Sequence, residues 1–174
     1  MKNLKKGFTL TEVLLTLGLA AIIIILIFMV LPKVLSASKS SQDIKNLTTL
    51  QSAVREIYRS QASFNGVSAD VLLKAKMVPE NMLANPAQTN TDIINAFSGK
   101  VFFGQVTNGF SIAFANIPPD ACVKMVTAVA PLFYQITANG VNVKAYYSTP
   151  QMDIGNVTTQ CSSNQSNYLI FYSN

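Results

Sequence analysis

Residues 5–33 read KKGFTLTEVLLTLGLAAIIIILIFMVLPK, and this stretch decides the organisation of the chain. The 19 residues from Val13 to Leu31 carry no charge, and only Thr16 and Gly18 among them are not strongly apolar. As a helix they span about 28 Å, close to the hydrocarbon thickness of about 30 Å in a bilayer. The pattern therefore predicts a single membrane-spanning helix near the N terminus.

Basic residues are distributed unequally around this segment. Lys2, Lys5 and Lys6 precede it, whereas only Lys33 and Lys39 follow soon after it. By the positive-inside rule, the N terminus lies in the cytoplasm and the bulk of the chain lies outside.

A secretory signal peptide, cut near Ser36-Ala37-Ser38, is one interpretation of such an N terminus. The apolar run exceeds the usual 7–15 residues, however, and a carboxylate, Glu12, stands at its head. A charge near the bilayer centre costs about 2.5–3.5 kcal/mol, and less near the edge. Glu12 therefore either has a partner or lies among lipid headgroups as part of a simple signal anchor.

The stretch from Lys5 to Leu14 resembles the N terminus of type IV prepilins and related pseudopilins. It joins a short basic leader, a Gly-Phe junction, a glutamate at fixed spacing and an apolar helix. The resemblance implies that residues 1–7 are a leader, which prepilin peptidase removes between Gly7 and Phe8, and that Phe8 is then N-methylated. It also implies that Glu12 neutralises the terminal amine of an adjacent subunit during assembly, a pairing favoured by low dielectric.

We expect residues 8–35 to form the membrane and filament-core helix, and residues 36–62 to continue it as an amphipathic helix that ends near Gln61. Gly18 and Pro32 interrupt the first part, either as a simple kink or as the ends of a segment that loses helicity in the filament. In the second part an apolar stripe recurs at steps of three and four: Ile44, Leu47, Leu50, Val54, Ile57 and Tyr58. Charged residues mostly occupy the other face: Lys39, Asp43, Lys45, Arg55, Glu56 and Arg59.

Residues 63–174 are expected to form a globular α+β head with an antiparallel sheet. The expected helices are 69–77, with Ser68 as N-cap, a turn over 79–83, and 121–130 after Pro118-Pro119-Asp120. The expected strands are 100–106, 110–115, 135–137, 141–146 and 168–172, with hairpin turns at Asn108-Gly109 and Asn139-Gly140. The polar stretch 148–167 is interpreted as a solvated loop, with a binding surface for a host or partner cell as the alternative.

Cys122 and Cys161 are the only cysteines, and the head is expected outside the cytoplasm. An even pair there predicts a disulfide, which would contribute up to about 4 kcal/mol for a 39-residue loop. A redox-active pair is the alternative, although no CxxC spacing supports it. Residues 61–103 and 110–134 also resemble type IVb pilins of the toxin-coregulated and conjugative thin-pilus kinds, whose disulfide encloses an exposed C-terminal region. The seven-residue leader is instead similar to that of type IVa pilins.

Composition argues against most enzyme classes. The chain has no histidine, which excludes Ser-His and Cys-His catalysis and an ordinary zinc site. The remaining carboxylates are scattered, and most are expected to be caps or surface groups: Asp70, Glu80, Asp92, Asp120 and Asp153. The net charge of +5 includes the three leader lysines, so the mature chain would carry ten basic against eight acidic side chains. We therefore expect no cofactor, metal or specific nucleic-acid binding, and we assign the aromatic residues Phe102, Phe103, Phe110 and Phe114 to the core.

The expected function is that of a non-enzymatic type IV pilus subunit. It would be held in the inner membrane and polymerised through its N-terminal helix into an extracellular filament for adhesion, conjugation or motility. Its expected partners are other copies of itself, prepilin peptidase, the assembly platform and minor pilins. The alternatives are a pseudopilin of type II secretion and a membrane-anchored adhesin or enzyme that does not polymerise.

Overall fold

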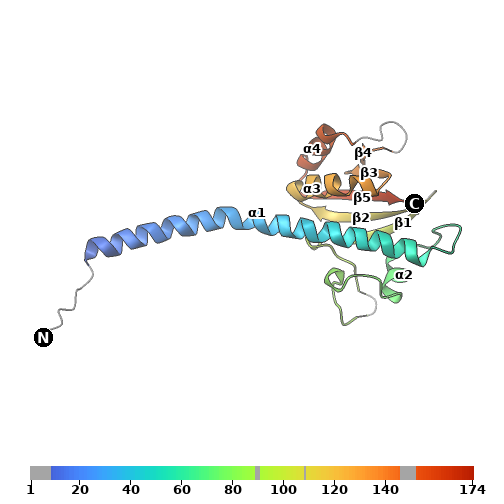
Figure 1. Ribbon diagram of the computed structural model, residues 1–174, viewed down its shortest axis with the longest axis horizontal. Coiled ribbons are helices and arrows are strands. Elements are labelled where there is room, and N and C mark those ends of the chain that lie inside the picture. Colours follow the sequence, from blue (N-terminus) through green and yellow to red (C-terminus); the bar gives the residue numbers. More distant parts are fainter. Residues whose placement is uncertain (1–8, 89–90, 108, 146–151) are drawn as a thin grey trace. The chain divides into compact units, whose positions relative to one another are not determined.

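A computed structural model describes residues 9–88, 91–107, 109–145 and 152–174 (Figure 1). The chain divides into two compact units, Met1–Ser36 and Ala37–Asn174. Helix α1 (Leu10–Ile57) runs through the boundary, so the second unit contains the amphipathic part of α1 together with the sheet and the remaining helices.

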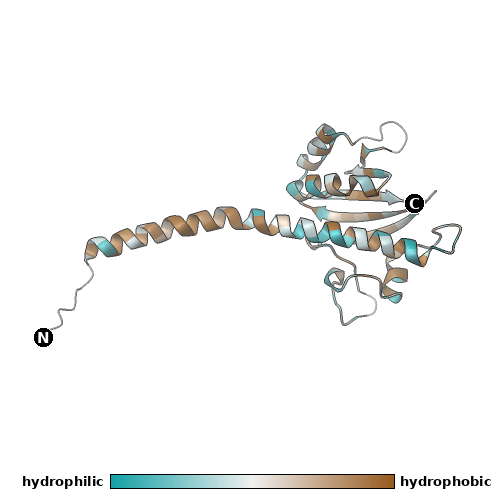
Figure 2. Cartoon of the chain, in the orientation of Figure 1, coloured by the Kyte–Doolittle hydropathy of each residue, from teal (hydrophilic) through white to brown (hydrophobic). Residues whose placement is uncertain are grey.

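The amphipathic part of α1 buries the predicted apolar stripe. Leu47, Leu50 and Val54 are fully buried, and Ile44 and Ile57 pack at the edge of the same core. Figure 2 shows the change along α1, from an almost continuously hydrophobic N-terminal part to mixed colours beyond it. The helix ends at Ile57, four residues before the predicted end, because the chain turns there and the Gln61 amide donates to the Tyr58 carbonyl.

One predicted surface residue of α1 is buried. Asp43 was expected on the charged face, but its side chain has no exposed surface. Its Oδ1 accepts a hydrogen bond of 2.9 Å from the Ala96 amide, 53 residues further along the chain. The prediction was wrong because helical periodicity cannot reveal that a distant loop needs an acceptor at this position.

Five antiparallel strands form the sheet, in the order β1-β2-β5-β3-β4. The α+β class and the two predicted hairpins are confirmed, although Asn108 and Tyr146 lie outside the described residues. The C-terminal strand is central, which ties the end of the chain to both hairpins. The strands are β1 (Val101–Val106), β2 (Gly109–Ile117), β3 (Gln135–Ala138), β4 (Val141–Lys144) and β5 (Asn167–Ser173).

The two faces of the sheet differ because successive side chains in a strand point to opposite sides. In register across four strands, Phe103, Ile112, Phe171 and Ile136 form a row on the inner face, in the same core as the α1 stripe. The adjacent row begins with Phe102, which is 46% exposed on the outer face. The assignment of Phe102 to the core was therefore wrong, whereas Phe110 and Phe114 are fully buried as predicted.

Two helices of the C-terminal half are joined by the disulfide between Cys122 and Cys161. Helix α3 (Pro119–Val129) begins at the predicted proline pair and continues as a short 3-10 turn, Ala130–Leu132. Helix α4 (Ile154–Ser162) lies in the stretch interpreted as a solvated loop, so that interpretation was wrong for these residues. Only Val157 and Cys161 of α4 are buried, and two apolar positions are too few to produce a recognisable period.

The connection between α1 and the sheet contains little regular structure. Helix α2 (Ala69–Lys74) is shorter than predicted, and Ser68 occupies its N-cap position without a side-chain hydrogen bond. A 3-10 turn, η1 (Glu80–Met82), matches the predicted helical turn. Isolated bridges, Leu83 to Ile93 and Ile94 to Lys100, then lead the chain into β1.

Candidate functional site

The N-terminal processing site predicted from the sequence lies outside the described residues. This applies to the leader 1–7 and to both residues of the junction, Gly7 and Phe8. Cleavage and methylation there stay predictions, because the described residues begin at Thr9.

Glu12 and Thr9 form a reciprocal capping box at the start of α1. The Thr9 amide and hydroxyl each donate to Glu12 Oε2 at 3.1 Å, and the Glu12 amide donates to Thr9 Oγ1 at 3.3 Å. This arrangement satisfies donors that the first turn of a helix otherwise leaves free. Sequence reasoning missed Thr9, although the Thr-x-x-Glu spacing is a known signal.

The capping box gives Glu12 a local partner in the isolated subunit. The carboxylate is hydrogen-bonded yet remains exposed at the head of the helix, where a cation from another molecule could reach it. A carboxylate in the first turn is also stabilised by the helix dipole. The geometry is therefore compatible with the predicted role of Glu12, while that role itself stays a prediction.

Helix α1 exposes its apolar side chains from Leu10 to Leu35. Most of the large ones are about half exposed or more, for example Leu14 at 61% and Phe28 at 73%. By length and composition α1 is the one helix among the described residues that could cross a membrane. A soluble monomer would not tolerate this much contiguous apolar surface, so the segment requires lipid or protein around it.

The predicted interruption at Gly18 and Pro32, either a simple kink or a segment that loses helicity in the filament, stays a prediction. Helix α1 continues through both residues, with Pro32 inside it. Any loss of helicity between them would belong to the assembled state and stays a prediction.

The disulfide between Cys122 and Cys161 is present and joins α3 to α4, with the two Cα atoms 5.7 Å apart. Both cysteines are fully buried in the core of the head. The prediction of a disulfide is confirmed, and its buried position between two packed helices is that of a structural cross-link.

An asparagine network reinforces the region enclosed by the disulfide. Asn167 Nδ2 donates to the carbonyls of Ile117 and Cys161 at 3.0 and 3.1 Å. Asn167 Oδ1 in turn accepts from Asn139 Nδ2 at 2.8 Å, and Asn139 Oδ1 accepts from the Tyr168 amide at 2.9 Å. The network therefore connects β2, the β3–β4 turn, α4 and β5. Sequence reasoning treated Asn139 only as a turn residue.

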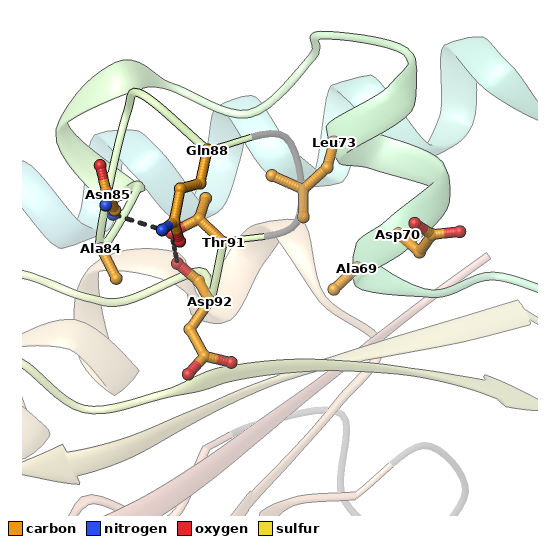
Figure 3. A pocket seen from close by; sticks show the side chains of 8 residues that line it. All are labelled: Ala69, Asp70, Leu73, Ala84, Asn85, Gln88, Thr91 and Asp92. Atoms are coloured by element: carbon orange, nitrogen blue, oxygen red, sulfur yellow. Dashed lines mark hydrogen bonds between the residues drawn. The ribbon is translucent and has the colours of Figure 1, made fainter.

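The carboxylates of the head do not converge on a common centre. An open depression of about 490 Å³ lies between α2 and the chain before β1 (Figure 3). Its two acidic residues, Asp70 and Asp92, point in different directions, and each pairs with a lysine: Asp70 with Lys74 at 2.7 Å and Asp92 with Lys100 at 2.8 Å. Within the described part of the chain, no three His, Cys, Asp or Glu side chains lie close enough to hold a metal ion. One of the predicted caps is confirmed away from this depression. The Asp153 side chain accepts a hydrogen bond from the Asn156 amide at the start of α4.

Comparison with known structures identifies the class of fold. The chain is similar to a type IVb pilin from Salmonella typhi, with a TM-score of 0.58 and 19% identity, over 77% of this chain and 99% of that one. It is also similar to TcpA, a type IV pilin from Vibrio cholerae El Tor, with a TM-score of 0.53 and 16% identity, over 77% of this chain and 98% of that one. The chain thus has the type IV pilin fold, of the type IVb form.

Sequence comparison identifies the family. The chain belongs to the family described as PilS N terminal, whose model matches residues 37–174. It is also 27% identical over 130 residues to the major structural subunit of bundle-forming pilus of Escherichia coli O127:H6, and a second strain, O111:H-, gives the same match. The matched stretch covers 72% of this chain and 66% of that protein, so it spans just under two thirds of the relatives' length.

Proposed function

We propose that the chain is a structural subunit of a type IV pilus of the type IVb kind. In this proposal, prepilin peptidase removes residues 1–7, Phe8 becomes the methylated N terminus, and the inner membrane holds the subunit through one helix with its N terminus in the cytoplasm. The subunit then polymerises through that helix into an extracellular filament, which serves adhesion, conjugation or motility.

The observation that carries the proposal is the union of two features in one chain. A head with the type IVb pilin fold is continuous with α1, whose first part exposes apolar side chains from Leu10 to Leu35. A helix of this kind can be surrounded by lipid before assembly and by the same helices of other copies afterwards. The pilin relatives, which are named as pilus subunits, support the same interpretation.

Glu12 supplies the electrostatic part of the proposed assembly step. Its carboxylate lies at the head of α1, and methylation of the Phe8 amine would leave that amine protonated. Attraction between the two groups strengthens as water is excluded around them, and each would otherwise be an uncompensated buried charge. We therefore propose that Glu12 accepts the terminal amine of the neighbouring subunit, in competition with its capping contacts to Thr9.

The C-terminal disulfide favours a pilin over a pseudopilin of a type II secretion system. The bond between Cys122 and Cys161 fixes α4 onto α3 late in the head, and pseudopilin heads commonly lack such a bond. The assembly platform and minor pilins are the remaining partners in the proposal. In the proposal, the peptidase, the assembly platform and the minor pilins carry out processing and assembly, and this chain catalyses neither step.

The proposal is tested by shearing cells that express the chain and examining the released material by electron microscopy and immunoblot. We expect abundant filaments that contain this chain, and we expect them to disappear in a strain without prepilin peptidase. If the chain stayed in the membrane fraction while the peptidase was active, the proposed function would be wrong.

A further inference from the structure

Three asparagines in the chain are followed directly by glycine: Asn65, Asn108 and Asn139. Asn108 lies outside the described residues. The pair Asn65-Gly66 lies in the connection between α1 and α2 (Figure 1), and the pair Asn139-Gly140 joins β3 to β4. The φ angles of the two glycines are 79° and 84°, and a Cβ placed on either would meet no atom within 4 Å. The glycines therefore match in conformation and in free space, so a difference between the two sites must come from the asparagines.

The Asn139 side chain is held by three hydrogen bonds. Its Nδ2 donates to the Gln160 carbonyl at 2.9 Å and to Asn167 Oδ1 at 2.8 Å, and its Oδ1 accepts from the Tyr168 amide at 2.9 Å. The main-chain amide of Asn139 also donates to the Tyr168 carbonyl at 2.8 Å. Movement of the Asn139 side chain toward the nitrogen of Gly140 therefore requires that several contacts break together.

The Asn65 side chain is in the opposite situation. Asn65 is exposed, and no hydrogen bond to its side chain or to the Gly66 main-chain amide is found among the residues that the structure describes. The turn closes around this pair, since the Val67 amide donates to the Phe64 carbonyl at 3.3 Å. The Gly66 nitrogen and Asn65 Cγ are thus free to approach each other, and both residues are exposed to water.

We propose that Asn65 is a site of spontaneous deamidation, whereas its hydrogen bonds protect Asn139 from the same reaction. The Gly66 main-chain nitrogen loses its proton to water or hydroxide and attacks Asn65 Cγ, which forms a five-membered imide ring. The bond between Cγ and Nδ2 breaks, and that nitrogen leaves as ammonia with a proton from solvent. Water then opens the ring at either carbonyl carbon, which gives aspartate or isoaspartate. One water is consumed and one ammonia is released, so the reaction needs no oxidant or reductant.

Two physical effects decide the relative rates at the two sites. Glycine favours the attack at both, because no side chain crowds the attacking nitrogen, and the reacting atoms belong to consecutive residues. At Asn139, each of the three hydrogen bonds contributes a factor of about 2 to 12 to the equilibrium between a held and a released side chain. Because all three must break, the expected protection of Asn139 relative to Asn65 is at least about tenfold.

Deamidation changes both the charge and the main chain at this turn. Either product adds one negative charge, so the mature chain would carry nine acidic against ten basic side chains. Isoaspartate also lengthens the main chain between Phe64 and Val67, next to the place where the Phe64 ring packs on Phe110 with the ring centroids 4.9 Å apart. In the proposed filament, the change would accumulate in every subunit as the filament ages. That consequence rests on the proposed function, whereas the reaction itself does not.

The test uses the full chain in detergent micelles, incubated at mildly alkaline pH and sampled over days. Trypsin cuts after Arg59 and Lys74, and the resulting peptide 60–74 contains Asn65 as its only asparagine. Mass spectrometry of this peptide and of 125–144, in which fragment ions separate Asn139 from Asn142, gives the deamidated fraction at each site. Isoaspartate is measured by enzymatic methylation of the same samples. Asn65→Ser is the matched control variant, and wild type incubated in urea is the unfolded control.

In the folded chain we expect Asn65 to deamidate at least about tenfold faster than Asn139, and in urea we expect comparable rates because the hydrogen bonds are lost. Asn65→Ser should show neither the mass change nor the isoaspartate in peptide 60–74. An Asn65 that keeps its amide in the folded chain, or an Asn139 that reacts as fast as Asn65, would overturn the inference. The same ratio of rates in urea would also overturn it, since the protection would then come from the local sequence. None of these results depends on filaments, so the proposed function is tested separately.

Discussion

Replacing Asp43 with asparagine is expected to change how the stability of the head depends on pH. Asp43 Oδ1 accepts from the Ala96 amide, whereas Oδ2 is buried and has no hydrogen-bond partner among the residues that the structure describes. Burial raises the pKa of this carboxyl from 3.8 to about 6, against the opposing effects of the Ala96 hydrogen bond and the positive charge of Lys39. Asparagine has nearly the same shape and keeps the acceptor for Ala96, but it cannot ionise.

The sign follows from proton linkage. The native state binds the Asp43 proton more tightly than the unfolded chain does. Protonated Asp43 therefore makes its full contribution to the free energy of unfolding below about pH 4. This contribution is lost as the pH rises through about 6, where the buried carboxyl must ionise. At 1.36 kcal/mol for each pH decade between the two pKa values, the total loss is about 3 kcal/mol.

The assay is urea unfolding of the full chain in detergent micelles between pH 4 and pH 8, followed by tyrosine fluorescence. The free energy of unfolding of Asp43→Asn, relative to that of the wild type, should rise by up to about 3 kcal/mol between pH 4 and pH 7.5. Asp70→Asn is the matched control, because Asp70 is exposed and paired with Lys74, and it should leave the wild-type slope almost unchanged. Parallel pH profiles for wild type and Asp43→Asn would refute the reasoning.

Three further predictions concern assembly and the C-terminal region. Glu12→Ala should still be processed but should reduce filament yield severely, because the neighbouring amine loses its partner; normal yield on shearing would contradict this. Cys161→Ser should lower the free energy of unfolding by up to about 4 kcal/mol, measured by urea unfolding, and an unchanged midpoint would exclude a stabilising role for the disulfide. Asn167→Ala should cost about 2–3 kcal/mol in the same assay, because it removes the side-chain donor from two buried carbonyls, and a loss below about 0.5 kcal/mol would show that other groups replace it.

The sequence was informative wherever one local signal dominated. The uncharged run from Val13 to Leu31, the stripe that includes Leu47 and Leu50, and the Asn139-Gly140 turn each predicted an element that the structure contains. The two cysteines predicted the disulfide because an even pair in an oxidising compartment has one simple outcome.

The sequence was misleading where a distant segment decides the role of a residue. Asp43 has the spacing of a surface carboxylate, and only the loop at Ala96 explains its burial. Phe102 and Phe103 are equally apolar, and the strand register alone decides which of them points outward. Helix α4 has only two buried residues, and the disulfide to α3 and the Asn167 hydrogen bond to the Cys161 carbonyl come from distant parts of the chain.

One error at the candidate site has a different cause. The capping role of Thr9 and Glu12 was missed although the Thr-x-x-Glu spacing is a local signal in the sequence, because the same carboxylate also fits an intermolecular role. In the proposed assembly step, two partners therefore compete for the Glu12 carboxylate. These are the amide and hydroxyl of Thr9 in the free subunit and the terminal amine of a neighbouring subunit in the filament.

The most direct test of the central claim is the intact mass and N-terminal sequence of the subunit in sheared filaments. The account predicts a chain that has lost residues 1–7, begins at N-methylated Phe8 and retains the Cys122–Cys161 disulfide. A filament-free chain that stays with the membranes and begins at Met1 would contradict the account.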